Sequence, residues 1–226
     1  MPETVIAIPG FWSHHLKELE ELNDYIYVNH RIIHKRTGTD YELEVVDHID
    51  QLSETFLPNE QFNSEELKQI DTHQTCLYII GMTESLEEIN ALVQVTTDLL
   101  KIDGMAIKVE SSGRSFMKKT WQSLIEEFNP YQYMTSIVQE SDVIYVTSGF
   151  QQFGEPEMMF EGFHADEIER YFLNWINKSI QEKREALKEK VIYDEGQQIK
   201  LDLIEYDFYP EDDLFYNPYG VVVFNK

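Results

Sequence analysis

The sequence predicts an α+β fold, with a mixed, mainly antiparallel sheet or sheets and amphipathic helices packed on one face. Strand-like and helix-like segments begin in the order β-α-β-β-α-β-α-β-α, which is less regular than a doubly wound parallel sheet requires. Apolar residues make up 42% of the 226 residues and include 13 Phe and 13 Tyr. This content supplies a sizeable core. We expect residues 1–226 to form a single domain, with a weak seam in the polar, irregular residues 47–62.

The chain opens with an apolar run from Val5 to Ile8, which is typical of a short buried strand. Pro9 and Gly10 end this strand, because both residues favour turns. Ser13 can then cap a short helix with its hydroxyl. The apolar face of that helix would consist of Leu16, Leu19 and Leu22.

A β-hairpin is the clearest local pattern in the sequence. We expect a strand over residues 25–33, a turn over residues 35–40 and a returning strand over residues 41–46. Apolar and acidic side chains alternate along the returning strand, which predicts one buried and one solvated face.

The middle of the chain alternates helices and strands. Asn63 and Glu66 have the spacing of a capping box and predict a short helix. A strand follows over residues 75–82. An apolar stripe over residues 84–101 predicts a helix, and Gly104 suits the left-handed residue that ends it. Residues 105–109 form the next predicted strand.

The last half of the chain contains two predicted helices, a loop and four strands. One helix follows Gly113 and ends at Asn129 and Pro130. A loop covers residues 149–162, and a long helix runs over residues 165–190. The predicted strands are residues 137–138, 143–147, 199–206 and 220–224.

The charge distribution limits the partners that the protein can bind. The formal net charge is −24, from 42 acidic and 18 basic residues. Residues 37–100 contain fourteen acidic side chains and one basic one, Lys68, and residues 120–169 contain ten acidic residues and no Lys or Arg. Nucleic acids and anionic membranes attract Lys and Arg, so we expect neither as a partner. A basic protein fits these stretches, although acidity also simply aids solubility.

Compartment is inferred from the single cysteine and from the apolar runs. Cys76 lies in an apolar segment, so we expect a buried core residue rather than a disulfide or a nucleophile. The first residues lack the basic region of a signal peptide, and no apolar run approaches the length of a transmembrane helix. We therefore expect a cytoplasmic protein.

Two pairs of residues have a spacing that suits metal ligands. His14 and Glu18 lie four apart on a predicted helix, and His30 and His34 lie four apart on a predicted strand, so each pair shares a face. Neither pair has a recognisable third ligand, and chance pairs are common among seven histidines. We predict no metal and no cofactor.

An anion site is the second chemical candidate. The run from Ser111 to Ser115 follows a predicted strand and should open a helix, where backbone N–H groups bind anions. Ser112, Gly113 and Arg114 are the candidate binding residues. The run lacks the P-loop pattern, and the alternative is a plain turn with a serine cap.

Two aromatic segments are candidate binding surfaces. Residues 150–160 combine Phe, Met, Gly and Pro, and we name Phe153 and Glu157 as candidate binding residues. If exposed, this loop is a binding surface; if buried, it fills the sheet. Residues 206–219 are acidic and aromatic, and either dock on a basic partner or pack their rings against the protein.

Three segments resemble the bacterial family named domain of unknown function 4261. They are the opening strand with Pro9, Gly10 and Trp12, the run over residues 92–121, and the run over residues 146–157 with its Phe-Gly-x-Pro-Glu sequence. The resemblance implies a bacterial, cytoplasmic α+β protein. It implies no activity, because the family has no assigned chemistry.

No catalytic motif, such as the Gly-x-Ser-x-Gly elbow, occurs in the sequence. We therefore expect a non-enzymatic protein-binding module with an acidic surface, of the immunity, antitoxin-like or regulatory kind. The alternative is a small-molecule-binding domain or an enzyme of unknown reaction, with its anion site between Ser111 and Ser115. The sequence predicts no catalytic residue and no oligomeric state.

Overall fold

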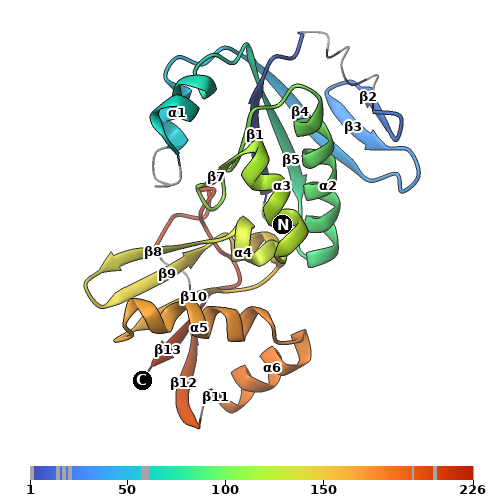
Figure 1. Ribbon diagram of the computed structural model, residues 1–226. Helices are drawn as coiled ribbons and strands as arrows, with labels where there is room; N and C mark the ends of the chain where they lie inside the picture. The colour runs from blue at the N-terminus through green and yellow to red at the C-terminus, as the bar shows by residue number, and fades with distance from the viewer. Residues whose placement is uncertain are drawn as a thin grey trace. The chain divides into compact units, whose positions relative to one another are not determined.

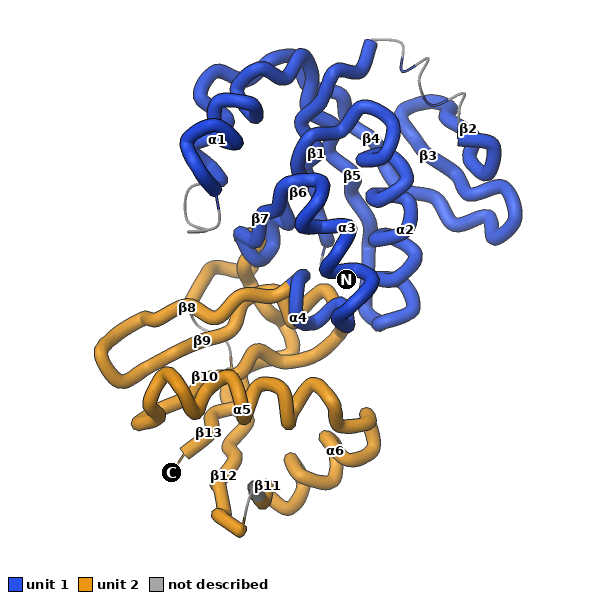
Figure 2. The backbone as a smooth tube through the Cα atoms, viewed as in Figure 1, with its two compact units in different colours: residues 1–134 blue, residues 135–226 orange. Residues whose placement is uncertain are grey.

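The computed structural model describes residues 3–13, 16, 19, 22–56, 62–194, 196–205 and 208–225. Helices and two mainly antiparallel sheets make up this part of the chain, which confirms the predicted α+β class. The chain divides into two compact units, residues 1–134 and residues 135–226 (Figure 2). Residues 47–62 lie inside the first unit. None of the described helices is long and apolar enough to cross a membrane.

The first unit is built on a seven-stranded antiparallel sheet (Figure 1). Its strands are β1 (Glu3–Gly10), β2 (Tyr25–Val28), β3 (Arg31–His34), β4 (Asp40–Asp47), β5 (Thr75–Met82), β6 (Ala106–Val109) and β7 (Arg114–Met117). Its helices are η2 (Leu52–Phe56), α1 (Ser64–Ile70), α2 (Leu86–Ile102), α3 (Lys118–Glu127) and α4 (Pro130–Met134). The strand order is β2-β3-β4-β5-β1-β6-β7, so β2 and β7 are the two edges.

Both faces of this sheet are covered. Successive side chains along a strand point to opposite sides, so Ala7 and Ile8 of β1 belong to different faces. On one face the small residues of the central strands pack against η2 and α1, in a buried cluster of Ala7, Leu52, Phe56, Ile70, Cys76 and Ala106. On the other face Gly104 packs closely against Ile8 of β1 and Leu100 of α2. Cys76 is a buried core residue, as predicted, and burial raises the pKa of its thiol to about 12.

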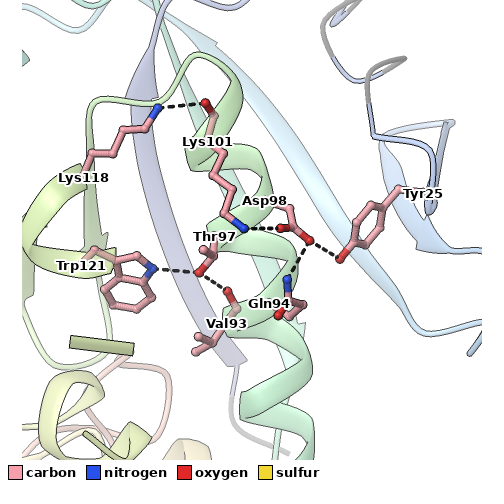
Figure 3. Close-up of polar contacts among 8 residues, drawn as sticks. All are labelled: Tyr25, Val93, Gln94, Thr97, Asp98, Lys101, Lys118 and Trp121. Atoms are coloured by element: carbon pink, nitrogen blue, oxygen red, sulfur yellow. Dashed lines mark hydrogen bonds and ion pairs between the residues drawn. The ribbon is translucent and has the colours of Figure 1, made fainter. Parts of the chain in front are cut away.

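Helix α3 is attached to α2 by two side-chain hydrogen bonds (Figure 3). Trp121 Nε1 donates to Thr97 Oγ1 at 2.9 Å, and Lys118 Nζ donates to the backbone carbonyl of Lys101 at 2.9 Å. Trp121 is fully buried. The second bond satisfies a carbonyl in the last turn of α2, where no intrahelical donor remains.

Asp98 ties strand β2 to α2 (Figure 3). Its carboxylate accepts hydrogen bonds from the Tyr25 hydroxyl at 3.2 Å and from Gln94 Nε2 at 2.9 Å, and it forms an ion pair with Lys101 at 3.1 Å. Burial, and then the charge of Asp98, raise the pKa of the Tyr25 hydroxyl. Tyr25 therefore remains a neutral donor to Asp98.

The local predictions in this unit have mixed outcomes. The capping box at Asn63 and Glu66 is confirmed, and so is the turn that leads into β4. The single strand over residues 25–33 is wrong, because Asn29 and His30 adopt positive φ angles of 49° and 59° and turn the chain between β2 and β3. The predicted helix after Ser13 falls largely on residues outside the described part of the chain.

The second unit contains a six-stranded sheet. Its elements are β8 (Ser136–Ser141), β9 (Ile144–Ser148), η3 (Phe150–Phe153), β10 (Glu157–Glu161), α5 (Ala165–Ile176), α6 (Ile180–Glu189), β11 (Val191–Asp194), β12 (Gln197–Ile204) and β13 (Val221–Asn225). The strand order is β11-β12-β13-β10-β9-β8. The β10–β13 pair is parallel and the other pairs are antiparallel.

Helix α5 supplies the aromatic core of this unit. Trp175 packs edge-on against Phe224 of β13 at 5.5 Å between ring centroids, and Phe172 packs edge-on against Phe150 at 6.1 Å. The predicted long helix over residues 165–190 is instead two helices. Ser179 starts α6, because its side chain and that of Glu182 form a capping box.

Candidate functional site

The run from Ser111 to Ser115 does not open a helix, so that prediction is wrong. Gly113 has a φ of 68° in the turn between β6 and β7, and Arg114 is the first residue of β7. Helix α3 begins only at Lys118. The N–H groups of a helix N-terminus therefore do not gather at Ser112 and Gly113.

Arg114 is a partly buried side chain that packs on an aromatic ring. Its guanidinium lies 5.1 Å from the centroid of the Phe116 ring. Burial lowers the pKa of Arg114, and its Nε has no hydrogen-bond partner within the described chain. The stacking on Phe116 favours an Arg at this position without any ligand.

The histidine pairs do not form a metal centre in the described part of the chain. His30 lies in the β2–β3 turn, and His34 Nδ1 lies 2.8 Å from Thr37 Oγ1. No group of three or more His, Cys, Asp or Glu side chains is arranged to hold a metal there. His14 and Glu18 lie outside the described residues.

A different histidine, His73, is fully buried in the first unit. Ile49 N–H donates to His73 Nε2 at 3.1 Å, so the ring proton is on Nδ1, which lies 2.8 Å from the Ile70 carbonyl oxygen. Burial lowers the pKa of His73. Because both ring nitrogens hold backbone groups, His73 supports the loop around η2 and is unavailable as a general base.

The aromatic segment over residues 150–160 is buried. Phe150, Phe153 and Phe160 all belong to the core of the second unit. The alternative of an exposed binding loop is therefore wrong, and the alternative of a segment that fills the sheet is confirmed. Phe153 is a core residue rather than a ligand contact.

Glu157 is a completely buried carboxylate at the centre of the second unit. It accepts hydrogen bonds from Thr147 Oγ1 at 2.6 Å, Gly149 N at 3.1 Å, Phe150 N at 2.8 Å and Asn217 Nδ2 at 3.1 Å. Burial raises the pKa of Glu157, while these four donors oppose the shift. A buried carboxylate requires such compensation, so Glu157 acts as a structural hub.

Asn217 carries this hub outward to a surface loop. Its Nδ2 also donates to the Glu155 carbonyl at 3.0 Å, and its Oδ1 accepts from Tyr219 N at 2.9 Å. Gln151 Nε2 donates to the Leu214 carbonyl at 3.1 Å and fixes the same loop at a second point. The loop before β13 is therefore anchored by buried polar side chains.

This anchored loop forms one wall of an open groove of about 690 Å³, which we call the 203–220 groove. Its lining residues are Leu203, Ile204, Glu205, Tyr209, Pro210, Glu211, Tyr216, Asn217, Pro218, Tyr219 and Gly220. Two are carboxylates, three are tyrosines, and none of the described lining residues is basic. Tyr206 and Asp207, which belong to the predicted acidic and aromatic segment, lie outside the described residues.

The chemistry of the 203–220 groove suits a cation. Carboxylates attract ammonium and guanidinium groups, and the faces of tyrosine rings attract the same groups through their π electrons. Glu205 and Glu211 are therefore the described lining residues that can hold a cationic group by an ion pair.

A second pocket, of about 500 Å³, lies in the first unit at the start of α3. Lys118, Lys119 and Thr120 line it together with Phe11 and other residues. Burial lowers the pKa of Lys118, whose amine already donates to the end of α2 (Figure 3). Glu66 and Asp103 line the same pocket, so its two lysines face two carboxylates.

Sequence reasoning located Glu157 and the acidic, aromatic segment but missed the residue that connects them. Asn217 lies 60 positions from Glu157, and an Asn before a proline is read only as a turn signal. Nothing in the local pattern indicates that its amide is buried.

No protein-family model, curated protein or solved structure matches this chain. The family resemblance therefore stays a prediction, and the candidate site rests on its geometry alone.

Proposed function

We propose that the protein is a non-enzymatic binding module, of the immunity, antitoxin-like or regulatory kind, that recognises a cationic segment of a partner protein. The observation that supports this proposal best is the 203–220 groove. Glu205 and Glu211 line it beside three tyrosines, and no described lining residue is basic.

Net charge and the groove side chains contribute to recognition at different distances. The net charge of −24 attracts a basic partner over a distance. At contact, the carboxylates of Glu205 and Glu211 face the cationic groups, and Tyr209, Tyr216 and Tyr219 offer apolar surface and ring faces. Because the groove is open to solvent, salt screens the electrostatic part of the interaction.

The buried hub makes this recognition less costly in entropy. Hydrogen bonds of Asn217 and Gln151 fix the part of the loop near Leu214 and Asn217, so a partner needs to order this part less. A preorganised site retains more of its contact free energy as affinity.

Isothermal titration calorimetry with a synthetic arginine-rich peptide tests the proposal. We expect binding that weakens when the salt concentration rises from about 50 to about 300 mM. The double variant Glu205→Gln/Glu211→Gln should bind about tenfold more weakly, because both groove carboxylates are lost.

The matched control is Glu169→Gln/Glu189→Gln, which neutralises two exposed acids on α5 and α6 and leaves the groove unchanged. It alters the net charge by the same amount. Equal weakening in both double variants would mean that total charge, rather than the groove, attracts the peptide, and would overturn the proposal.

The start of α3, beside Lys118 and Lys119, supports a second candidate function, the binding of a small anion, which the carboxylates of Glu66 and Asp103 in the same pocket oppose. The first turn of α3 contains no acidic residue, and Met117 gives it no side-chain cap. Inorganic phosphate is the simplest probe. Phosphate binding that is lost in Lys119→Gln and kept in Lys188→Gln would favour this function over the first.

A further inference from the structure

We propose that the outer edge of β8 is a second docking site, at which an extended basic segment of the partner adds a strand to the sheet. The inference rests on the proposed function in one respect, namely that the partner is basic. It adds a different surface and a different mode of recognition, because the contact is made by backbone hydrogen bonds.

Strand β8 is at the end of the six-stranded sheet and pairs with β9 alone. The register places Ile137 opposite Thr147 and Val138 opposite Val146. The other side of β8 has no neighbouring strand in the described sheet. An edge of this kind presents a row of backbone N–H and C=O groups to a further strand.

The edge of β8 differs from the other three edges of the two sheets. The edge strands β2, β7 and β11 have four residues each, whereas β8 has six. Proteins protect edges by shortness, proline or lysine, and the sequence of β8, SIVQES, contains neither residue. Its protective features are the irregular register between Gln139 and Ser141 and the charge of Glu140, which repels acidic strands but attracts basic ones.

The side chains of β8 are open to a partner on both faces of the sheet. Ile137 is 38% exposed and Val138 is 45% exposed, and they point to opposite faces. All residues from Ile137 to Ser141 are exposed. An incoming strand would cover β-branched side chains on both faces, which is the pairing that stabilises sheets.

Charge decides which kind of strand fits this edge. Glu140 and Asp142 lie at the end of the β8–β9 hairpin, and residues 120–169 contain no Lys or Arg. A second copy of this chain would be repelled, because it carries the same acids at this edge and the same net charge of −24. A strand that alternates basic and β-branched residues complements both the charge and the apolar side chains.

The hub at Glu157 also supports this edge. Thr147, which lies opposite Ile137 in the register, donates to Glu157 at 2.6 Å and accepts from Met158 N at 2.8 Å. Glu157 therefore fixes both β9, the neighbour of β8, and Asn217, which lines the 203–220 groove. A partner strand would add to a sheet that is already rigid.

Hydrogen exchange followed by mass spectrometry tests this inference, with a synthetic peptide of alternating Lys and Val as the probe. We expect the peptide to slow exchange of the amides in residues 136–141. Val138→Lys should weaken binding about tenfold, because a lysine on the edge repels the basic strand. Val143→Lys is the matched control, since Val143 is 54% exposed in the same hairpin but lies between the two strands.

The groove variant Glu205→Gln/Glu211→Gln separates this inference from the proposed function. Protection of β8 that persists in this variant supports a distinct docking edge. A peptide that binds with no protection of β8, or that binds Val138→Lys and Val143→Lys equally, overturns the edge and leaves the groove proposal standing. A peptide that binds neither surface at low salt overturns both.

Discussion

The second unit contains two aromatic, acidic segments of similar composition and opposite environment. Residues 150–160 are in the core, around the carboxylate of Glu157, whereas residues 208–219 form the wall of an open groove. Four hydrogen-bond donors converge on Glu157, and Glu211 remains exposed at the surface. A carboxylate becomes part of a core only where donors replace water. Composition alone therefore does not identify a binding surface.

The largest expected effect comes from removing one aromatic ring from each segment. Phe150→Ala should lower the free energy of unfolding by about 3–5 kcal/mol, because the ring is fully buried and packs on Phe172. Tyr209→Ala should lower it by less than about 1 kcal/mol, since Tyr209 is 40% exposed. Urea unfolding followed by circular dichroism measures both. Equal losses would show that the two segments are not energetically different.

A smaller effect is expected from the hub itself. Glu157→Gln should lower the free energy of unfolding by about 1–3 kcal/mol, because the new amide group meets donors where the carboxylate accepted hydrogen bonds. Glu161→Gln is the control on the same strand, since Glu161 is exposed. If Glu157→Gln were as stable as Glu161→Gln, the structural role of the buried Glu157 carboxylate would be refuted.

The smallest expected effect is a pH dependence of the stability difference between the wild type and Glu157→Gln. Burial raises the pKa of Glu157 in the folded protein above its ordinary value of 4.5. Its contribution to stability is therefore complete below pH 4.5 and is lost as the pH rises through the folded pKa, by at most about 1.4 kcal/mol per pH unit. The wild type should therefore lose part of its stability advantage over Glu157→Gln as the pH rises above 4.5, because the glutamine at position 157 does not titrate. A difference independent of pH would contradict the raised pKa.

Predictions that depend on neighbouring residues were the most successful. The capping box at Asn63 and the turn into β4 are confirmed, because hydrogen bonds over three or four residues decide them. The break before α6 has the same kind of signal, Ser179 with Glu182, but the apolar periodicity of residues 165–190 obscured it. The sequence predicts helix where β7 forms, because four residues are too few to show the alternation of a strand.

The candidate site was only partly predictable. The acidic and aromatic composition of residues 206–219 pointed to the groove, but its anchors Asn217 and Gln151 lie more than 60 residues from each other. Tertiary packing, rather than local pattern, decides which polar side chains meet. The helix start predicted after Gly113 is wrong, because the chain forms β7 there and begins α3 at Lys118. The anion site near Arg114 therefore loses the helix N-terminus on which it depended and stays a prediction.

The most direct test of the central claim is NMR of ring-labelled tyrosines during titration with the arginine-rich peptide. The 203–220 groove contributes Tyr209, Tyr216 and Tyr219, whereas Tyr25 and Tyr133 belong to the first unit. We predict that the ring signals of the three groove tyrosines shift in proportion to bound peptide, while those of Tyr25 and Tyr133 do not. Binding that leaves the three groove signals unchanged would contradict the account.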